Sequence, residues 1–220
     1  MRGTFAHDRF SGGEEIAHAI THGLGSLCSV AGLVVLIWRA SSGGDARLVV
    51  GVTVFGTAML VLYTASTLYH ALTAARAKFV FKLLDHGAIY LLIAGSYTPF
   101  ALIVLGGGWG WTLFGLSWGL ATLGILYEVV WRRPWKWLSL VFYLALGWLA
   151  VIAVKPLMAV LPTQALLLMG CGGVAYSGGA VFYAWRGFPY HHAVWHLFVL
   201  AGTALHYFCV LRFVIPAGMP

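Results

Sequence analysis

Seven long apolar stretches constrain the fold of this chain more than any other feature of its sequence. A helix needs about 20 mainly apolar residues to cross the hydrocarbon core of a bilayer. Runs of this length lie near residues 16–39, 47–72, 80–105, 109–130, 135–154, 163–185 and 193–215. Only 9% of the 220 residues are charged, whereas soluble domains carry roughly 25%. The sequence therefore predicts an all-α integral membrane bundle of seven transmembrane helices.

The first fifteen residues, "MRGTFAHDRFSGGEE", are polar and charged, unlike the start of a secretory signal, which leads directly into a short apolar core. We interpret residues 1–15 as a polar cytoplasmic amino-terminal segment. The connections between the later runs are too short to hold a second folded domain. Residues 16–220 are therefore predicted to form a single seven-helix transmembrane domain.

The distribution of lysine and arginine predicts the orientation, because cytoplasmic loops of membrane proteins carry the excess of these residues. With the amino terminus inside, the inner side holds Arg2, Arg9, Arg76, Lys78, Lys82, Arg132, Arg133, Lys136 and Arg186. The outer side then holds Arg39, Arg47, Lys155 and Arg212. We therefore expect a cytoplasmic amino terminus, and we attribute the net charge of +7 to topology and to anionic lipid rather than to nucleic acid.

Ionisable side chains inside a membrane are costly and tend to mark function. His70 closes the second apolar run, Asp85 opens the third, and His192 and His196 open the seventh. In the predicted topology all four lie at the cytoplasmic end of the bundle. Residues four apart in a helix are about 40° apart around the axis and about 6 Å apart along it. His192 and His196 can therefore bind one ion together.

These residues have the chemistry of a zinc site. Catalytic zinc is often held by three protein ligands, with water as the fourth. His70, His192 and His196 would supply three imidazole nitrogens, and Asp85 would hold the water or receive its proton. Ser66 adds a hydroxyl one turn from His70 on the same helix face. We therefore predict Zn²⁺ as the cofactor.

Other polar residues in the apolar runs receive structural interpretations. His18 and His22 form a second pair four residues apart, to which we assign helix packing or support of the main site rather than a separate metal site. We expect His86 to form a hydrogen bond to a neighbouring helix. Glu128 is expected to pair with Arg132 across one helical turn.

Four motifs in order along the chain resemble a known family. The phrases "EEIAHAITHGLG", "STLYH" and "LDHGAIYLLIAGSYTPF" and the closing HxxxH resemble the hemolysin III branch of the progestin and adipoQ receptor (PAQR) family. The resemblance runs from about residue 11 to the end of the chain. One position departs from it: His18 stands where members of the family commonly have asparagine.

The resemblance implies a multi-pass zinc protein of the bacterial cytoplasmic membrane, in a superfamily that includes the alkaline ceramidases and is thought to contain metal-dependent lipid amide hydrolases. It implies that His70, His192 and His196 bind the metal. It also implies that Ser66 and Asp85 are the polar partners around the bound water. Position at the cytoplasmic end of the apolar runs and helix spacing select the same residues.

We therefore expect a zinc-dependent hydrolase that acts on an amide or acyl bond of a membrane lipid, with lipid or fatty acid as its partner and a role in membrane homeostasis. One alternative is a lipid-responsive sensor or receptor in which zinc is structural. Another is a hemolysin-type pore or ion-translocating protein, which we disfavour because the outer half of the predicted bundle is poor in polar residues. The sequence does not predict an oligomeric state.

Overall fold

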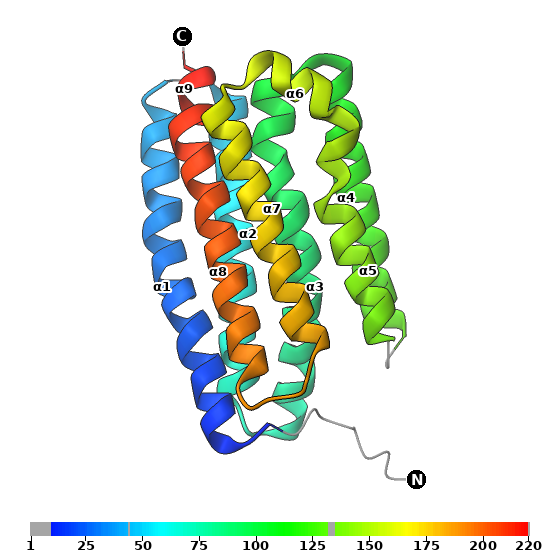
Figure 1. The fold of residues 1–220 in the computed structure, drawn as a ribbon. Helices are drawn as coiled ribbons and strands as arrows, with labels where there is room; N and C mark the ends of the chain where they lie inside the picture. The colour runs from blue at the N-terminus through cyan, green and yellow to red at the C-terminus, as the bar shows by residue number, and fades with distance from the viewer. Residues whose placement is uncertain (1–9, 44, 132–134, 220) are drawn as a thin grey trace.

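The computed structural model describes residues 10–43, 45–131 and 135–219, and these residues form a bundle of long helices (Figure 1). The helices in chain order are α1 (Gly12–Ser41), α2 (Ala46–Ala71), α3 (Ala75–Pro99), α4 (Gly107–Val130), α5 (Lys136–Gly147), α6 (Val154–Val160), α7 (Thr163–Ala184), α8 (His191–Cys209) and α9 (Ile215–Ala217). A π-helical turn follows α3 and another follows α8, and a 3₁₀ turn joins α5 to α6. Nearly all of the described chain is therefore helical.

These elements make seven spans that are long and apolar enough to cross a membrane, counted over the described residues. The spans are Gly12–Ser41, Ala46–Ala71, Ala75–Leu105, Gly107–Val130, Lys136–Val160, Thr163–Ala184 and His191–Ala217. The predicted all-α bundle of seven transmembrane helices is thus confirmed. The protein is a multi-pass integral membrane protein.

Helix α1 begins at Gly12, several residues before the first predicted span. Ser11 is its N-cap: the Ser11 hydroxyl accepts a hydrogen bond from the Glu14 backbone N–H, and the Glu14 carboxylate accepts one from the Ser11 N–H at 2.8 Å. This reciprocal capping box satisfies two N–H groups that a helix start leaves without partners. Its sequence signature is the Ser–x–x–Glu of "SGGE".

Helix α1 has an apolar outer face and a polar buried face, the reverse of a surface helix in a water-soluble protein. Ile16 and Leu27 point outward and are 62% and 70% exposed. The buried face carries His18 and His22, followed by Gly25 and Ser29 one and two turns further on. Apolar side chains can face lipid at no cost, whereas polar ones must find partners inside the bundle. Helix α1 therefore brings imidazoles to the protein interior.

Packing brings three helices together around those imidazoles. Helix α1 packs along α2 and also against α8, and α2 packs along α3. In Figure 1, α4 and α5 lie on the far side of α3 from α1. Helices α1 and α8 begin at the end of the bundle where α2 ends. We call this the amino-terminal end of the bundle.

Where the fifth span departs from α-helical geometry, a side chain of a neighbouring helix bonds the freed backbone groups. The fifth span changes from α-helix to a 3₁₀ turn after Gly147, which frees backbone groups. The Tyr97 hydroxyl, on α3, donates to the Gly147 carbonyl oxygen at 2.6 Å and accepts from the Ala150 N–H at 3.0 Å. Because no water is available inside a bilayer to bond such groups, the break is tolerated where a neighbouring helix supplies the partner.

Candidate metal centre

Three histidines from two helices meet at the amino-terminal end of the bundle. His70 is in the last turn of α2, and His192 and His196 lie in the first two turns of α8. Each can offer one ring nitrogen such that the three nitrogens lie within 4.8 Å of one another. The helix spacing that places His192 and His196 on one face is thus realised, and α2 supplies the third ring. This group could hold a metal ion.

His70 is held in a fixed orientation by a carboxylate on α1. Its Nδ1 lies 2.6 Å from Glu15 Oε2, to which Nδ1–H donates a hydrogen bond. The other Glu15 oxygen accepts from Lys78 Nζ at 2.7 Å. The His70 Nε2 atom is buried and has no hydrogen-bond partner in the part of the chain that the structure describes. A ring whose one nitrogen donates to a carboxylate while the other is free is the usual arrangement of a histidine ligand.

His196 is oriented in the same way by a hydroxyl. Thr21 Oγ1 lies 3.0 Å from His196 Nδ1. The Thr21 hydroxyl proton is directed to backbone carbonyl oxygens of its own helix, those of Ala17 and His18, each at 2.9 Å. Thr21 Oγ1 therefore accepts from His196 Nδ1–H. In that tautomer the lone pair of His196 is on Nε2.

The two α1 histidines lie against this group. The His22 ring stacks on His196, with centroids 3.5 Å apart and planes 10° from parallel. The His18 ring is completely buried and contacts His70, His192 and His196 edge to face. Both nitrogens of each α1 histidine lack hydrogen-bond partners within the described ranges. His22 thus contacts the group through His196, whereas His18 lies among the candidate ligands themselves.

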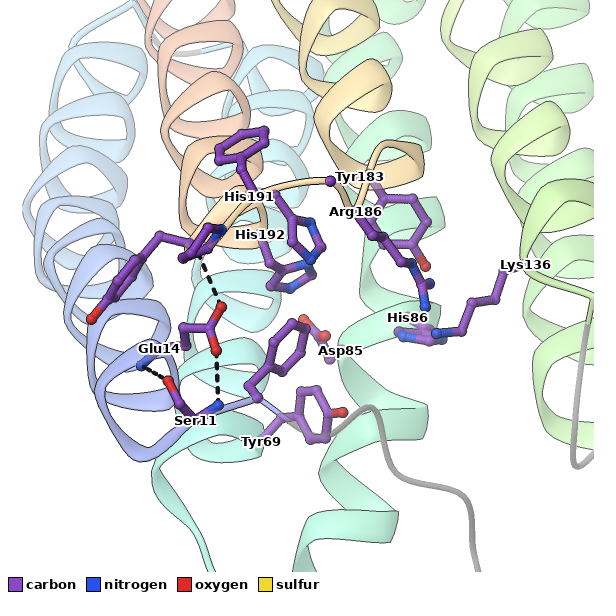
Figure 2. A pocket seen from close by; sticks show the side chains of 15 residues that line it. Ser11, Glu14, Tyr69, Asp85, His86, Lys136, Tyr183, Arg186, His191 and His192 are labelled. Carbon is purple, nitrogen blue, oxygen red and sulfur yellow. Dashed lines mark hydrogen bonds between the residues drawn. The ribbon is translucent and has the colours of Figure 1, made fainter.

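A cavity of about 640 Å³ opens beside the cluster. Its lining includes His192 and Asp85, together with Lys136 and Arg186 and several aromatic side chains. Figure 2 shows the side chains of Asp85 and His192 turned toward this space. Ligand pockets commonly enclose about 300–1,000 Å³. The cavity is therefore large enough for the reactive end of a lipid.

Ser66, the other residue predicted to act on the water, lies one turn before His70 on α2. It is completely buried, and its hydroxyl has no hydrogen-bond partner among the described residues. Asp85 lies on α3 and is close enough to His70 and His86 for electrostatic interaction with both. The structure thus places both residues near the histidine cluster, on the two helices that flank it.

The donor set suits a transition metal. Buried polar atoms in proteins nearly always have hydrogen-bond partners. The nitrogens of His18 and His70 that have none among the described residues are therefore available to a ligand. Imidazole nitrogens suit zinc, copper, iron and nickel, whereas calcium and magnesium prefer oxygen. A tetrahedral zinc ion with histidine ligands therefore fits the residues present.

Sequence reasoning did not assign roles to two residues that orient the cluster, Glu15 and Thr21. A usable signal existed for Glu15, since it shares one face of α1 with His18 and His22 at spacings of three and four residues. Thr21 offered none, because its contact with His196 joins residues 175 positions apart.

Glu14 connects the starts of two helices that carry these histidines. Its carboxylate caps α1 and also accepts a hydrogen bond from the Tyr190 backbone N–H at 3.0 Å (Figure 2). Tyr190 immediately precedes α8 and has φ 61° and ψ 11°, the left-handed region that non-glycine residues seldom occupy. The Glu14 contact thus holds the entry to α8 beside the start of α1.

The fold and the site define a multi-pass helical membrane protein with a buried histidine cluster at one end of its bundle. The chain belongs to the haemolysin-III related family, whose family model matches residues 10–207. The predicted membership of the hemolysin III branch is thereby confirmed.

Individual relatives agree with this assignment. The chain is 47% identical over 205 residues to Hemolysin-3 of Bacillus cereus, which covers 93% of this chain and 94% of that protein. It is 48% identical over 202 residues to the Hemolysin-3 homolog of Bacillus subtilis, covering 92% and 95%. It is 28% identical over 167 residues to the human monocyte to macrophage differentiation factor, covering 73% and 69%. This last similarity is consistent with the wider PAQR relationship.

Proposed function

We propose that this protein is a zinc-dependent membrane hydrolase that cleaves an amide or acyl bond of a lipid. The observation that carries the proposal is the set of three convergent imidazoles, His70, His192 and His196, beside a cavity that Asp85 also lines. A carboxylate and a candidate metal site facing one cavity are the parts that hydrolysis of an acyl group requires.

The ion would be held by His70, His192 and His196. When bound, zinc supplies Lewis acidity toward water and toward an acyl carbonyl group. Glu15 and Thr21 keep the His70 and His196 rings in the orientation and tautomer that leave Nε2 free. The protein's own contribution at this level is a prearranged set of lone pairs, which removes the cost of ordering the ligands during binding.

Asp85 is the proposed proton carrier. In this role its carboxylate accepts a proton from the attacking water and returns it to the leaving nitrogen or oxygen of the substrate. Ser66, with an unpaired buried hydroxyl, orients the water by a hydrogen bond. The aromatic side chains of the cavity, which include Tyr69 and Tyr183, would contact the lipid next to the bond that breaks.

The test is to supply ceramide-like substrates to the purified protein in detergent or liposomes and to measure the release of fatty acid. We expect activity that chelation abolishes and added zinc restores. Asp85→Asn should retain zinc but lose at least about 100-fold in rate, since general acid–base catalysis contributes about 10²–10⁴-fold. His206→Ala is the control, because that ring faces the Met169 carbonyl oxygen at 3.3 Å and lies outside the cluster. Fatty-acid release that persists after chelation would contradict the proposal.

A second candidate function is favoured by the position of His18. Structural zinc sites are closed by four protein ligands, and His18 supplies a fourth imidazole at the cluster. In that case zinc would join α1, α2 and α8, and a lipid in the cavity would act as a signal rather than as a substrate. Saturable binding of lipid without turnover would support this sensor function.

A further inference from the structure

The four rings of the cluster are arranged with near-equal spacing. The centroid of His18 lies 4.7 Å from that of His70, 4.9 Å from that of His192 and 5.5 Å from that of His196. The other three separations, among the predicted ligands themselves, are 5.3, 5.4 and 4.6 Å. By this measure His18 belongs to the group as much as any of the three.

This spacing is the one that a tetrahedral ion would require. A zinc–nitrogen bond of about 2.0–2.1 Å, extended to the ring centre, places each centroid roughly 3.2 Å from the ion. Four such centroids at tetrahedral angles would lie roughly 5 Å from one another. The six observed separations, from 4.6 to 5.5 Å, bracket that value.

Within the described part of the chain, the nitrogens of His18 have no other use. The side chain has no exposed surface, and neither Nδ1 nor Nε2 has a hydrogen-bond partner among the described residues. A buried imidazole with two unpaired nitrogens is expensive, because it has given up its bonds to water without replacement. Phe10 packs edge-on against the ring, with centroids 4.6 Å apart, and offers no polar contact. A metal ion at the centre of the four rings would use one of the two nitrogens.

We propose that His18 is a fourth nitrogen ligand of the ion, so that the resting centre is bound by four histidines from α1, α2 and α8. The inference rests on the metal site of the proposed function and extends it to α1. His18 also belongs to a group of close ligand atoms with His70, in which Glu15 rather than an α8 histidine is the third member and all three atoms lie within 4.8 Å of one another.

A four-histidine centre has a chemical consequence. With three protein ligands, one position of the ion remains open to water. With His18 bound, that position is filled, and water or an anion enters only if His18 leaves. His18→Asn should therefore open the centre while leaving His70, His192 and His196 in place. It should also weaken zinc binding by at least about 10-fold, the smallest loss usual for residues that support a metal.

The test replaces zinc with Co²⁺, whose visible absorption reports its ligands, and adds azide as a small anion that binds open positions. For the unaltered protein we expect a tetrahedral Co²⁺ spectrum that azide leaves unchanged. For His18→Asn we expect a spectrum that shifts on addition of azide. His22→Asn is the matched control, because His22 lies one turn further along α1, is similarly buried and has equally unpaired nitrogens, yet stacks on His196 rather than facing the centre. Its spectrum should resemble that of the unaltered protein.

An azide response already present in the unaltered protein would overturn the inference, as would identical spectra before and after His18→Asn. X-ray absorption of the zinc-loaded unaltered protein gives an answer that needs no variant: four imidazoles support the inference, and three imidazoles with a water oxygen refute it. Failure of the unaltered protein to bind Co²⁺ or Zn²⁺ would refute both the inference and the proposed metal site. A bound metal with four imidazoles and no lipid hydrolysis would uphold the inference and reject the hydrolase.

Discussion

Two buried polar clusters lie between helices of this bundle, and they differ in how their side chains are satisfied. In the first, the α1–α2–α8 cluster of His18, His70, His192 and His196, both nitrogens of His18 and one of His70 have no hydrogen-bond partner among the described residues. In the second, on α3, α4 and α5, Glu128 accepts a hydrogen bond from Ser139 through one oxygen, while its other oxygen lies 3.5 Å from His86 Nδ1 and has no hydrogen-bond partner among the described residues.

The difference separates two uses of polar groups in a membrane protein. A carboxylate that accepts a hydrogen bond from one neighbouring helix and lies beside a histidine of another ties these helices together, because removing its partners would leave a charge uncompensated in a medium of low dielectric. In the first cluster Glu15 and Thr21 already join α1 to His70 and His196. Further nitrogens of this cluster have no partner among the described residues and are open to a ligand. Among the described residues, both groups that could hold a metal include His70, and neither includes His86 or Glu128. The first cluster is thus suited to ligand binding and the second to helix packing.

The largest effect should follow removal of a proposed ligand from the first cluster. In His196→Ala we expect metal affinity to fall by more than about 100-fold, because loss of a supporting residue alone costs about 10–100-fold. Metal content after purification in zinc, measured by mass spectrometry, and the metal-dependent shift in melting temperature both check this. His206→Ala, three residues before the end of α8, should retain the metal. Equal metal content in the two variants would remove the first cluster as the binding site.

A smaller effect should follow removal of the group that orients His70. In Glu15→Gln the His70 Nδ1–H loses its carboxylate acceptor, and we expect zinc affinity to fall by about 10–100-fold. Competition with a chromogenic chelator measures this affinity. The neighbouring carboxylate gives a matched control, because Glu14 contacts backbone N–H groups of Ser11 and Tyr190 rather than a histidine ring. Equal losses in Glu14→Gln and Glu15→Gln would indicate a general disturbance of α1 instead.

The smallest effect on metal, none, is expected from the second cluster. Glu128→Ala leaves the Ser139 hydroxyl without its acceptor and removes the carboxylate beside His86, which should lower the free energy of unfolding by about 1–3 kcal/mol. Thermal unfolding in detergent measures the loss, and zinc content should stay at the level of the unaltered protein. Ser139→Ala, which removes a single donor, should destabilise less. Loss of zinc from Glu128→Ala would show that the two clusters are coupled.

The bundle itself could be predicted from the sequence because the bilayer imposes a length on every span. Each predicted apolar run corresponds to an observed span, and the misplaced boundaries have local causes. The start of α1 lies earlier than predicted because the capping box of Ser11 and Glu14 adds a polar first turn that hydropathy does not register. The fifth span continues to Val160 because a 3₁₀ turn, bonded to Tyr97, carries it past the predicted end at residue 154.

From the residues alone, the candidate site could be predicted only through the depth of each polar side chain in the membrane. Depth placed His70 and Asp85 at the same level as the α8 histidines, and the resemblance selected the same residues. Depth does not reveal which helices are neighbours, so the approach of His18 to the group could not be read from the sequence. Glu128 was expected to pair with Arg132, which lies outside the described residues. Among the described residues Glu128 accepts a hydrogen bond from Ser139 on α5 and lies 3.5 Å from His86 on α3.

The Glu14 contact with Tyr190 has a mechanical consequence. Because one carboxylate fastens the beginning of α1 to the residue that enters α8, a lipid that pushes on the α7–α8 connection would also pull on the helix that carries His18. The Glu14 side chain therefore links the entry of a molecule beside the α7–α8 connection to the geometry around the imidazoles.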